Sequence, residues 1–491
     1  MRLTWHKYKY YPYEKDFAVR EIKALLSPAG IKEEKAGLLL DRPRFPEAAK
    51  RLVYFSQVQN GGGIPHPTQQ AMLEQFNGNE TSRQSTRYSA HGLHEYKGKF
   101  NPQVAKAMLN FFGVKPGQTV FDPFCGSGTS LVECVHVGVQ AFGTDINPMA
   151  VFLANAKISS LGIPAEDLRE ESRLVVSRTK WSTWRLGGGG AREEYLLAWF
   201  TPEVLADIER LRLSIQSSDK STMPILLAIA SNLLREYSLQ DPKDLRIRRR
   251  KSPLPKTPFF EAFREGAEKF CSHLQGAQAS IGVVSSGSEG VVSDCRSIRH
   301  NGSGRFDCAI TSPPYATALP YIDTQRLSLV WLDLVSPDSI SPLEADLLGS
   351  REIRGQSKRA MLDAVMANTA HLPDDEAQLC VQLQNALSEG DGFRRQVVPS
   401  LLYRYFSGMS DAFSSIKRLM KKGAKFGLIV GGNHTVLGGN RFDLDTPGHL
   451  ANLAVSRGWK HEETVALQTY RRYGYHVNNA TSREALVVLR A

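Results

Sequence analysis

The alternation of apolar and polar positions is most regular between residues 87 and 160, where it predicts an α/β arrangement. Apolar residues recur at helical spacing over residues 102–112 and 129–137. Short segments of apolar and β-branched residues over 118–121 and 140–144 are typical of buried strands, and an aspartate follows each of them. Helix, strand, helix and strand in this order predict two parallel strands joined by a right-handed crossover.

The residues before this region have a different pattern. Helical spacing over residues 17–26 follows an aromatic and basic start. A glycine-rich segment at 57–63 is expected to be a flexible link into polar residues that continue to residue 86. We therefore expect an N-terminal accessory module over residues 1–86 and the first half of the α/β domain over residues 87–160.

After residue 160 the strand signal is lost for more than a hundred residues. The glycines at 187–190 are expected to form a linker, and the following residues 193–237 have helical spacing. Thr201-Pro202-Glu203 is typical of a capped helix start within this segment. We expect residues 161–285 to form a helical insertion that is a candidate for target recognition.

Residues 286–491 are expected to complete the α/β domain, with a second, polar and helical insertion at about 340–395. The expected elements are strands at 290–294, 306–310 and 426–430, a helix at 403–420, and final strands at 461–470 and 484–489 that bracket a long loop.

The charge, the cysteine content and the hydrophobic runs of the chain indicate which partners and which compartment to expect. The 491 residues carry a formal net charge of +11 with a pI near 9.3, which favours a polyanionic partner. The six cysteines form no C-x-x-C pair, so we expect buried reduced thiols and no metal site. The N-terminus lacks the apolar core of a signal peptide, and no run reaches the roughly 18 apolar residues of a membrane span. We therefore expect a cytoplasmic protein.

The strand at 118–121 runs directly into Asp122-Pro123-Phe124-Cys125-Gly126-Ser127-Gly128-Thr129. Because glycine lacks a Cβ, this backbone can turn sharply and approach a ligand beyond the carboxyl end of the strand. A phosphate-binding P-loop is excluded because no Gly-Lys-Ser/Thr follows. Asp145 ends the next strand, where an acid accepts hydrogen bonds from ribose hydroxyls or, alternatively, caps a helix. Asp294 ends a third strand. It could accept a hydrogen bond from an adenine amino group, or it could be a simple turn residue.

A second chemical motif, Thr311-Ser312-Pro313-Pro314-Tyr315, follows the strand at 306–310. The two prolines fix the backbone and remove competing N–H donors. Hydroxyl and carbonyl acceptors then lie beside one flat aromatic face. On its own this segment is also typical of a simple turn at the end of a strand.

Together, the two motifs resemble those of the S-adenosylmethionine-dependent DNA methyltransferases of the N4-cytosine/N6-adenine type. The shared signatures are D-P-F-x-G-S-G-T, an acid after the second strand, and [D/N/S]-P-P-[Y/F]. Residues 91–102 resemble the segment that precedes the glycine motif in this family and closes over the methionyl end of the cofactor. The resemblance covers roughly 87–150, 290–335 and 400–490, and it implies a Rossmann-like methyltransferase sheet. That sheet is mostly parallel with an antiparallel C-terminal strand, and here it would carry large helical insertions.

The resemblance also implies which residues bind S-adenosylmethionine. They are Phe100, Asp122, Phe124, Gly126, Ser127, Gly128, Thr129, Asp145, Ile146, Asp294 and Cys295.

Methylation of an exocyclic amine requires the nitrogen to become more tetrahedral, because its lone pair is delocalised into the base. Hydrogen bonds to the Ser312 hydroxyl and the Pro313 carbonyl would achieve this, Pro314 would hold the turn, and Tyr315 would stack on a base flipped out of the duplex. Within the family, serine at position 312 is more typical of N4-cytosine methylation. C5-cytosine methylation needs a cysteine nucleophile after a proline, and Cys125 lies within the cofactor turn instead.

The candidate DNA-binding residues are those of the basic run Arg246, Arg248, Arg249, Arg250 and Lys251, which a solvated basic helix face would also explain. Weaker candidates are residues 349–354 and the loop 471–479. Double-stranded DNA is the expected partner, and a separate restriction or defence subunit is an open alternative. Also open are an adenine-N6 methyltransferase, an RNA base methyltransferase and a catalytically silent DNA-recognition subunit.

Overall fold

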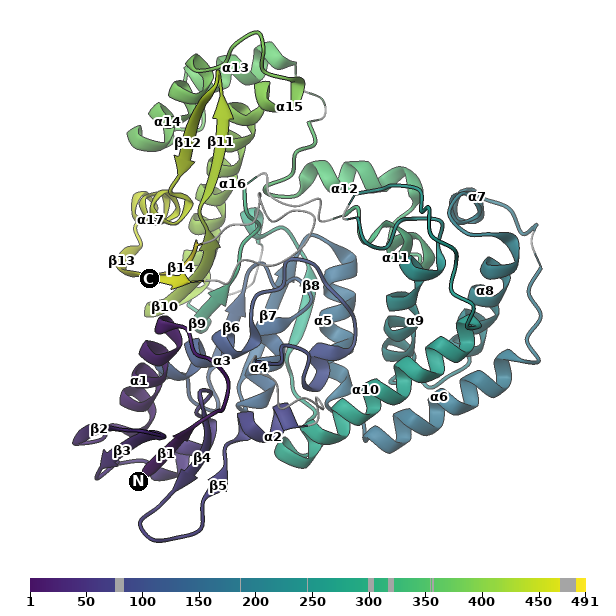
Figure 1. The fold of residues 1–491 in the computed structure, drawn as a ribbon. Coiled ribbons are helices and arrows are strands. Elements are labelled where there is room, and N and C mark those ends of the chain that lie inside the picture. Colours follow the sequence, from purple (N-terminus) through teal and green to yellow (C-terminus); the bar gives the residue numbers. More distant parts are fainter. Residues whose placement is uncertain are drawn as a thin grey trace.

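Seven strands form the central sheet, in the order β13-β14-β10-β9-β6-β7-β8 (Figure 1). They are β6 (Thr119–Asp122), β7 (Gln140–Asp145), β8 (Glu289–Val292), β9 (Phe306–Thr311), β10 (Met420–Gly431), β13 (Lys460–Gln468) and β14 (Arg483–Arg490). Neighbours from β10 to β8 pair in parallel, whereas β14 is antiparallel to both β10 and β13. This confirms the expected Rossmann-like sheet with an antiparallel C-terminal strand.

The computed structural model describes residues 1–75, 84–185, 187–244, 246–298, 304–316, 322–353, 355, 357–468 and 483–491.

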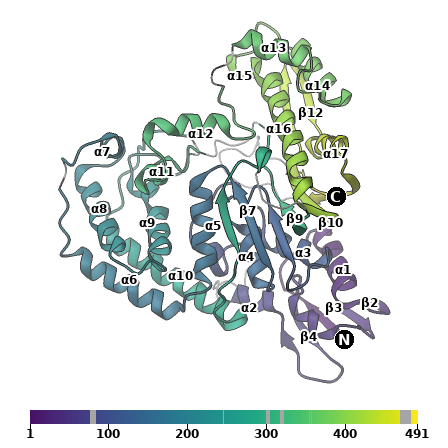
Figure 2. The same ribbon diagram turned by 180° about the vertical axis from the view of Figure 1, so that it is seen from behind.

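The two faces of the sheet belong to two hydrophobic cores because successive side chains of a strand point to opposite sides. Val120 packs into one core and Phe121 into the other. The first core includes residues of α3 (Pro102–Phe111), α4 (Thr129–His136) and α5 (Pro148–Ser160), and the second includes residues of α16 (Val398–Leu419) and α17 (Thr446–Ser456). Figure 2 shows α5 and α16 on either side of the strands.

The N-terminal residues form a second, five-stranded sheet in the order β2-β3-β1-β4-β5. Its elements are β1 (Arg2–Trp5), α1 (Pro12–Leu26), β2 (Gly30–Glu34), β3 (Gly37–Asp41), η1 (Pro46–Arg51), β4 (Phe55–Gln59) and β5 (His66–Pro67), followed by α2 (Gln69–Gln75) and η2 (Ser89–Gly92). The flexible link expected at 57–63 is wrong in its first part, because Gln57 and Val58 pair with β1 inside this sheet. Helix α1 docks on the central sheet, where Arg20 donates to Glu463 at 2.6 Å.

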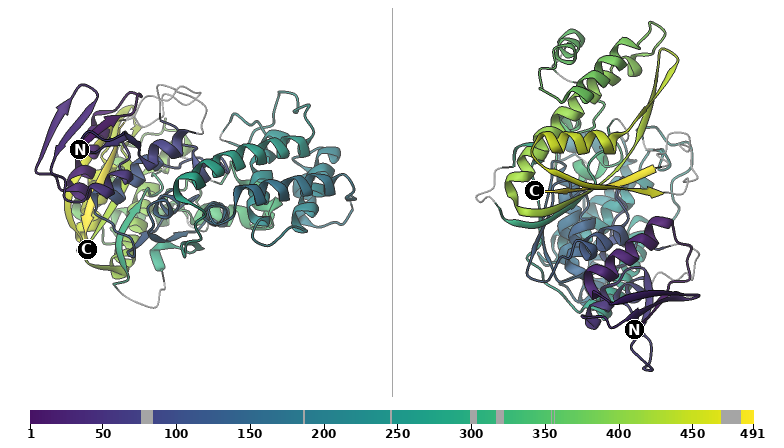
Figure 3. Two further views of the ribbon diagram at one scale, coloured as in Figure 1. Left: turned by 90° about the horizontal axis from the view of Figure 1, so that it is seen from below. Right: turned by 90° about the vertical axis from the view of Figure 1, so that its left-hand side faces the viewer.

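Between α5 and β8 the described elements are helices. They are α6 (Ala165–Thr179), α7 (Ala191–Leu197), α8 (Pro202–Gln216), α9 (Met223–Tyr237) and α10 (Phe259–Ile281), and η3 (Cys295–Ser297) follows β8. The predicted capped start at Thr201 is confirmed, since its side chain accepts a hydrogen bond from the Val204 N–H. Viewed from below, these helices extend away from the side of the molecule that holds both termini (Figure 3).

Between β9 and α16 lie short helices, and a hairpin follows β10. The elements are α11 (Arg326–Trp331), η4 (Pro337–Ser339), α12 (Ile340–Asp346), α13 (Lys358–Met366), α14 (Asp374–Asn385), α15 (Phe393–Gln396), β11 (Asn433–Leu437) and β12 (Asn440–Leu444). Helices α13 to α15 and the hairpin form an upper lobe beside α16 (Figure 1). Among the described helices, none combines the length and apolar character that crossing a membrane requires.

Candidate active site

The two predicted motifs lie side by side because they follow neighbouring parallel strands. Val120 of β6 pairs with Cys308 of β9, and Phe121 pairs with Ala309. The carboxyl ends of the two strands therefore reach the same edge of the sheet. The structure thus brings the glycine turn and the Ser-Pro-Pro-Tyr segment together.

The Asp122 carboxylate joins the two motifs. Its Oδ1 accepts hydrogen bonds from Thr311 Oγ1 at 2.6 Å and from the Phe124 N–H at 3.1 Å, and its Oδ2 accepts from Ser130 Oγ. Burial raises the pKa of Asp122 to about 6, and the hydrogen bonds from Ser130 and Thr311 act against that rise. Because Thr311 directly precedes Ser312, this carboxylate positions the Ser-Pro-Pro-Tyr segment relative to the glycine turn. Direct contact between Asp122 and the cofactor stays a prediction.

The glycine turn needs both of its glycines. Gly126 and Gly128 have φ values of +48° and +79°, which L side chains rarely adopt. A Cβ on Gly128 would also lie 2.8 Å from the Cβ of Ala154, so the turn is pressed against α5. Tyr96 lies over the turn, with its Cε1 3.4 Å from where a Gly126 Cβ would be. One residue of the segment 91–102 therefore reaches the glycine turn, and closure of the segment over the methionyl end of the cofactor stays a prediction.

Asp145 ends β7 beside this turn. Its Oδ2 accepts a hydrogen bond from the Gly126 N–H at 3.0 Å, and its Oδ1 accepts from the Asn147 N–H at 2.9 Å. The alternative that Asp145 caps α5 is wrong, because the N-cap is Asn147, whose side chain accepts from the Met149 N–H. Burial raises the pKa of Asp145 to about 6. Each carboxylate oxygen keeps a further lone pair that can accept from a ribose hydroxyl.

A buried lysine supports the turn from behind. Lys157 Nζ on α5 donates to the carbonyl oxygen and to the Oγ of Ser127, both at 2.9 Å. Burial lowers the pKa of Lys157 well below its usual value, and the positive charge of Lys99 adds to this effect. Within the described ranges, no carboxylate lies within 4.0 Å of its Nζ. Its hydrogen bonds therefore fix Ser127 in the turn.

A buried network that the sequence did not reveal lies one helical turn further along α4. Glu133 Oε1 accepts from Tyr88 Oη and from His91 Nε2, each at 2.7 Å, and Oε2 lies 3.1 Å from His136 Nδ1. Ser89 Oγ lies 2.9 Å from the other ring nitrogen of His136. Burial favours the neutral form of Glu133, but the contacts with His136 and His91 outweigh it and hold the pKa well below its usual value.

This network ties η2 to α4 and so fixes the start of the segment that carries Tyr96. Burial lowers the pKa of His91 to about 3, so its neutral ring donates through Nε2 to the carboxylate. His91, Glu133 and His136 each offer one ligand atom within 4.8 Å of the others, a grouping that a metal ion could also use. The hydrogen bonds of Glu133 with His91 and His136 already explain why these three side chains lie together. A glutamate inside the apolar run Leu131–Val135 was the available sequence signal.

The Ser-Pro-Pro-Tyr segment is held from two sides. Tyr315 Oη donates to Glu484 Oε1 of β14 at 3.1 Å, and Asn433 Nδ2 donates to the carbonyl oxygen of Ala316 at 3.0 Å. Ser312 is half-buried at the end of β9. The hydroxyl of Ser312 and the ring of Tyr315 are therefore carried by a fixed backbone, as their predicted roles require.

The other predicted cofactor residues include Phe100, Phe124, Ile146, Asp294 and Cys295. Asp294 follows β8 and accepts from the backbone N–H of Arg296 and from its guanidinium at 2.7 to 2.9 Å. An adenine amino group would therefore share this carboxylate with Arg296. Phe100, Phe124 and Ile146 are partly buried against the two cores, and Cys295 is buried. All six cysteines are free and buried, as expected.

Part of the predicted DNA-binding run serves the fold. The guanidinium of Arg249 lies 4.7 Å from the ring centre of Trp199. Arg250 donates to the carbonyl oxygens of Glu236 and Ser238 at 2.5 and 3.0 Å, where it caps the end of α9. The described part of the run is a loop, so the alternative of a basic helix face is wrong.

The other basic residues of the run are also exposed. Arg248 pairs with Asp244 at 3.0 Å, while Arg246 and Lys251 are exposed. Of the weaker candidates 349–354, Gly349 lies against the Ser-Pro-Pro-Tyr segment, whereas Arg354 and the loop 471–479 lie outside the described residues.

Comparison with known proteins shows a similarity around the glycine turn. Residues 93–174 match UPF0020, described as RMKL-like, methyltransferase domain. This part of the chain is therefore similar to a methyltransferase domain. The turn fits the expected cofactor, S-adenosylmethionine: Gly126 and Gly128 carry no side chain, and Asp145 offers acceptors beside them.

Relatives extend this similarity to Type II methyltransferases and to a tRNA methyltransferase. The chain is 30% identical over 159 residues to Type II methyltransferase M.MjaII of Methanocaldococcus jannaschii, covering 31% of this chain and 29% of that protein. It is 26% identical over 293 residues to Type II methyltransferase M.MvaI of Kocuria varians, covering 54% and 63%. Over 79 residues it is 37% identical to tRNA (guanine(10)-N2)-dimethyltransferase of Methanothermobacter thermautotrophicus, covering 16% and 24%. The chain thus spans less than two thirds of each.

Proposed function

We propose that this protein transfers a methyl group from S-adenosylmethionine to the exocyclic amino group of a DNA base, with N4 of cytosine as the target. The observation that carries the proposal is the hydrogen bond between Thr311 Oγ1 and Asp122 Oδ1, which fixes the Ser-Pro-Pro-Tyr segment beside the glycine turn. Similarity to two Type II methyltransferases supports DNA as the substrate, within a modification or defence system.

The glycine turn and Asp145 would hold S-adenosylmethionine, which would supply the methyl group of its sulfonium to the target nitrogen. Ser312 Oγ and the Pro313 carbonyl would accept hydrogen bonds from the amino group and favour a tetrahedral nitrogen. Tyr315 would stack on the flipped base, its ring held by the hydrogen bond to Glu484.

Two other target amines are also supported by specific observations. Adenine N6 presents the same kind of amino group, so the acceptors of Ser312 and Pro313 suit it as well. An RNA guanine-N2 amine is favoured by the similarity to a tRNA (guanine(10)-N2)-dimethyltransferase, although that match covers 16% of this chain. A catalytically silent DNA-recognition subunit is disfavoured by the intact Ser-Pro-Pro-Tyr segment.

The variant Ser312→Ala tests the proposed catalytic role. We expect it to bind S-adenosylmethionine with the affinity of the wild type in calorimetry, because Ser312 directly follows β9 and is not part of the glycine turn. Transfer of a radiolabelled methyl group to plasmid DNA should fall at least tenfold, the cost of about one hydrogen bond in the transition state. Unchanged transfer would remove Ser312 from the mechanism. Loss of cofactor binding would mean that the residue serves the fold.

A further inference from the structure

The chain returns to the cofactor side of the site after the Ser-Pro-Pro-Tyr segment. We call residues 312–325 the target segment, of which 312–316 and 322–325 are described. Its last residue, Gln325, is the N-cap of α11. Gln325 Oε1 accepts a hydrogen bond from Asn147 Nδ2 at 2.7 Å, and both side chains are buried. Because Asn147 follows two residues after Asp145, the end of the target segment is attached to the loop that is predicted to hold the cofactor ribose.

The direction of this hydrogen bond is set by the other contacts of Asn147. Its Oδ1 accepts from the Met149 N–H at 3.0 Å as the cap of α5, so its Nδ2 is the atom that faces Gln325. The backbone N–H of Asn147 donates to Asp145 Oδ1 at 2.9 Å. Asn147 is therefore a fixed donor, and the amide of Gln325 must turn its oxygen toward it. A buried amide pair costs free energy unless such a hydrogen bond is made.

The start of the target segment is attached to the other cofactor loop. Thr311, the residue before Ser312, donates through Oγ1 to Asp122 Oδ1 at 2.6 Å. The loops after β6 and β7 are themselves joined, because the Gly126 N–H donates to Asp145 Oδ2 at 3.0 Å. The two ends of the target segment are thus held by two loops that are bonded to each other.

Helix α11 is also held further along its length by the helical insertion. Ser231 Oγ of α9 donates to Ser328 Oγ at 2.8 Å, and both side chains are buried. Arg192 of α7 donates to the carbonyl oxygen of Trp331 at 2.9 Å. Figure 2 shows α11 beside α9, and the helix also contacts α5. Because α11 is anchored in this way, the position of Gln325 at its start sets where the chain leaves the target segment.

We propose that Asn147 and Gln325 are positioning residues, which fix the target segment relative to the bound cofactor and couple cofactor binding to the order of α11. Neither side chain is assigned a contact with the reacting atoms. A cofactor held at Asp145 would restrain Asn147, and Asn147 would restrain Gln325 through their hydrogen bond. This inference rests on the proposed function and deepens it, because it describes how the two halves of the same site are kept in register.

The test compares variants that remove the hydrogen bond with one that keeps it. Gln325→Met keeps the length of the side chain and removes the acceptor. Asn147→Ser keeps a good cap for α5 but is too short to reach Gln325. Asn147→Asp also keeps the cap, and Gln325 can rotate its amide to donate to the new carboxylate. The third variant therefore preserves the link with its direction reversed.

The first measurement is single-turnover methyl transfer to DNA at saturating S-adenosylmethionine. Gln325→Met and Asn147→Ser should each be about 10- to 100-fold slower than the wild type, because a misplacement of about 1 Å can cost about 100-fold in rate. The double variant should be no slower than the slower single variant, since both substitutions remove the same bond. Asn147→Asp should stay within about threefold of the wild type, because the link is kept.

The second measurement does not depend on methyl transfer. Hydrogen–deuterium exchange of the peptide covering residues 322–331 is followed with and without S-adenosylhomocysteine, the demethylated cofactor. In the wild type this compound should slow exchange, because Asn147 passes the restraint to α11. In Gln325→Met the slowing should be lost, although calorimetry shows that the compound still binds. A bond that serves only the fold would change exchange equally with and without the compound.

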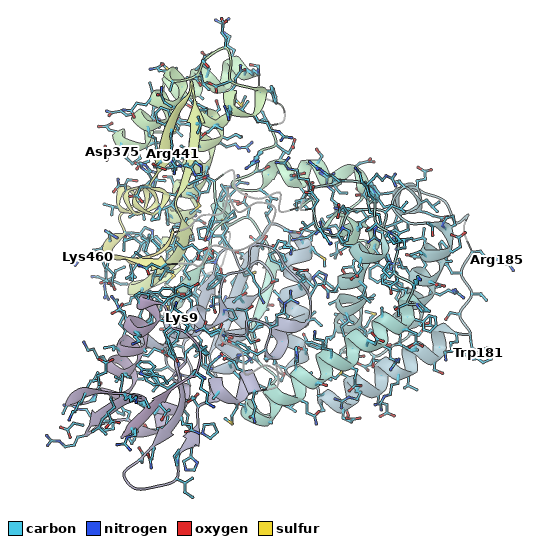
Figure 4. All side chains as sticks on the ribbon, in the orientation of Figure 1. Lys9, Trp181, Arg185, Asp375, Arg441 and Lys460 are labelled. Carbon is cyan, nitrogen blue, oxygen red and sulfur yellow. The ribbon has the colours of Figure 1, made fainter. Side chains whose placement is uncertain are left out.

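Gln278→Met is the matched control. Gln278 of α10 donates to the carbonyl oxygen of Ile163 at 2.6 Å and accepts from the Ala165 N–H at 3.0 Å, within the helical insertion. Its loss should lower the melting temperature without lowering the transfer rate. Lys460→Met places the same residue at an exposed position on the outer edge of the molecule (Figure 4) and should change neither quantity.

A Gln325→Met protein with the wild-type transfer rate and the wild-type response of α11 to S-adenosylhomocysteine would overturn the inference. Additive rate losses in the double variant would overturn it as well. Failure of the wild type to methylate any DNA would instead refute the proposed function. The exchange measurement would in that case still decide whether Asn147 and Gln325 couple the cofactor loop to α11.

Discussion

Replacement of Asp122 by asparagine tests whether one carboxylate joins the cofactor turn to the catalytic segment. Asparagine has the same size but keeps a single acceptor oxygen where the carboxylate has two. Three donors converge on Asp122: Thr311 Oγ1 at 2.6 Å, the Phe124 N–H at 3.1 Å, and Ser130 Oγ. The variant can therefore satisfy the hydroxyls only if one of them turns to accept from the new amide.

The expected cost follows from these contacts. Hydrogen bonds to a charged group contribute about 1.5–3 kcal/mol, so the loss of one should lower the free energy of unfolding by about 2 kcal/mol. Thr311 is one residue from Ser312, and a shift of about 1 Å in a reacting group can cost about 100-fold in rate. We therefore expect Asp122→Asn to lower kcat by 10- to 100-fold, a range set by the same misplacement.

A double-mutant cycle with Thr311→Val measures the link itself. Valine keeps the shape of threonine and removes the hydroxyl that reaches Asp122. If Thr311 acts through Asp122, the double variant should be less destabilised than the sum of the single variants by about 1 kcal/mol. Urea denaturation gives the stabilities, and single-turnover methyl transfer at saturating S-adenosylmethionine gives the rates. Ser130→Ala is the control, because it removes the bond on the cofactor side.

Additive effects of Asp122→Asn and Thr311→Val on both stability and rate would refute the link. So would a Thr311→Val enzyme with the wild-type kcat. Ser130→Ala should weaken cofactor binding more than it lowers kcat, and the reverse pattern would also contradict the assignment.

Three further predictions concern the turn and the target pocket. Gly128→Ala should lower the free energy of unfolding by about 1 to 3 kcal/mol more than Gly138→Ala, because both have positive φ but only Gly128 would clash, and thermal denaturation checks this. S-adenosylmethionine should bind more weakly as pH falls below about 6, where Asp145 protonates. Because burial raises that pKa, the same protonation favours the folded state, so calorimetry and unfolding should change in opposite directions with pH. Tyr315→Phe and Glu484→Ala should each raise KM for DNA a few-fold with kcat nearly unchanged, and equal effects of the two variants and of their combination would follow from the shared hydrogen bond.

Much of the central sheet could be predicted because its strands carry their own signal. Residues 118–121 and 306–310 are short apolar segments that end in motifs, and the parallel strands β6 and β9 form there. The N-terminal strands could not be predicted in the same way. β2 has mostly exposed residues without alternation, and it is stabilised by pairing with β3 and not by its own pattern.

The site was predicted in its residue types but not in its connections. Position in sequence identifies Asp122 and Thr311 as parts of two motifs, but their hydrogen bond depends on β6 and β9 being neighbours. The basic run shows a case in which the sequence suggested a binding role that the structure assigns to the fold for some residues. Arg249 and Arg250 are charged in sequence, yet their guanidinium groups contact Trp199 and the end of α9. Charge alone cannot show which arginines face a partner.

The most direct test of the central claim is mass spectrometry of nucleosides after incubation with S-adenosylmethionine that carries a deuterated methyl group. Genomic DNA and total tRNA would be treated separately, with Ser312→Ala protein as the control. We predict labelled N4-methylcytosine in DNA treated with the wild-type protein and none with the variant. Labelled N6-methyladenine would change the target base, whereas label confined to a guanine of tRNA would contradict the assignment of DNA as the substrate.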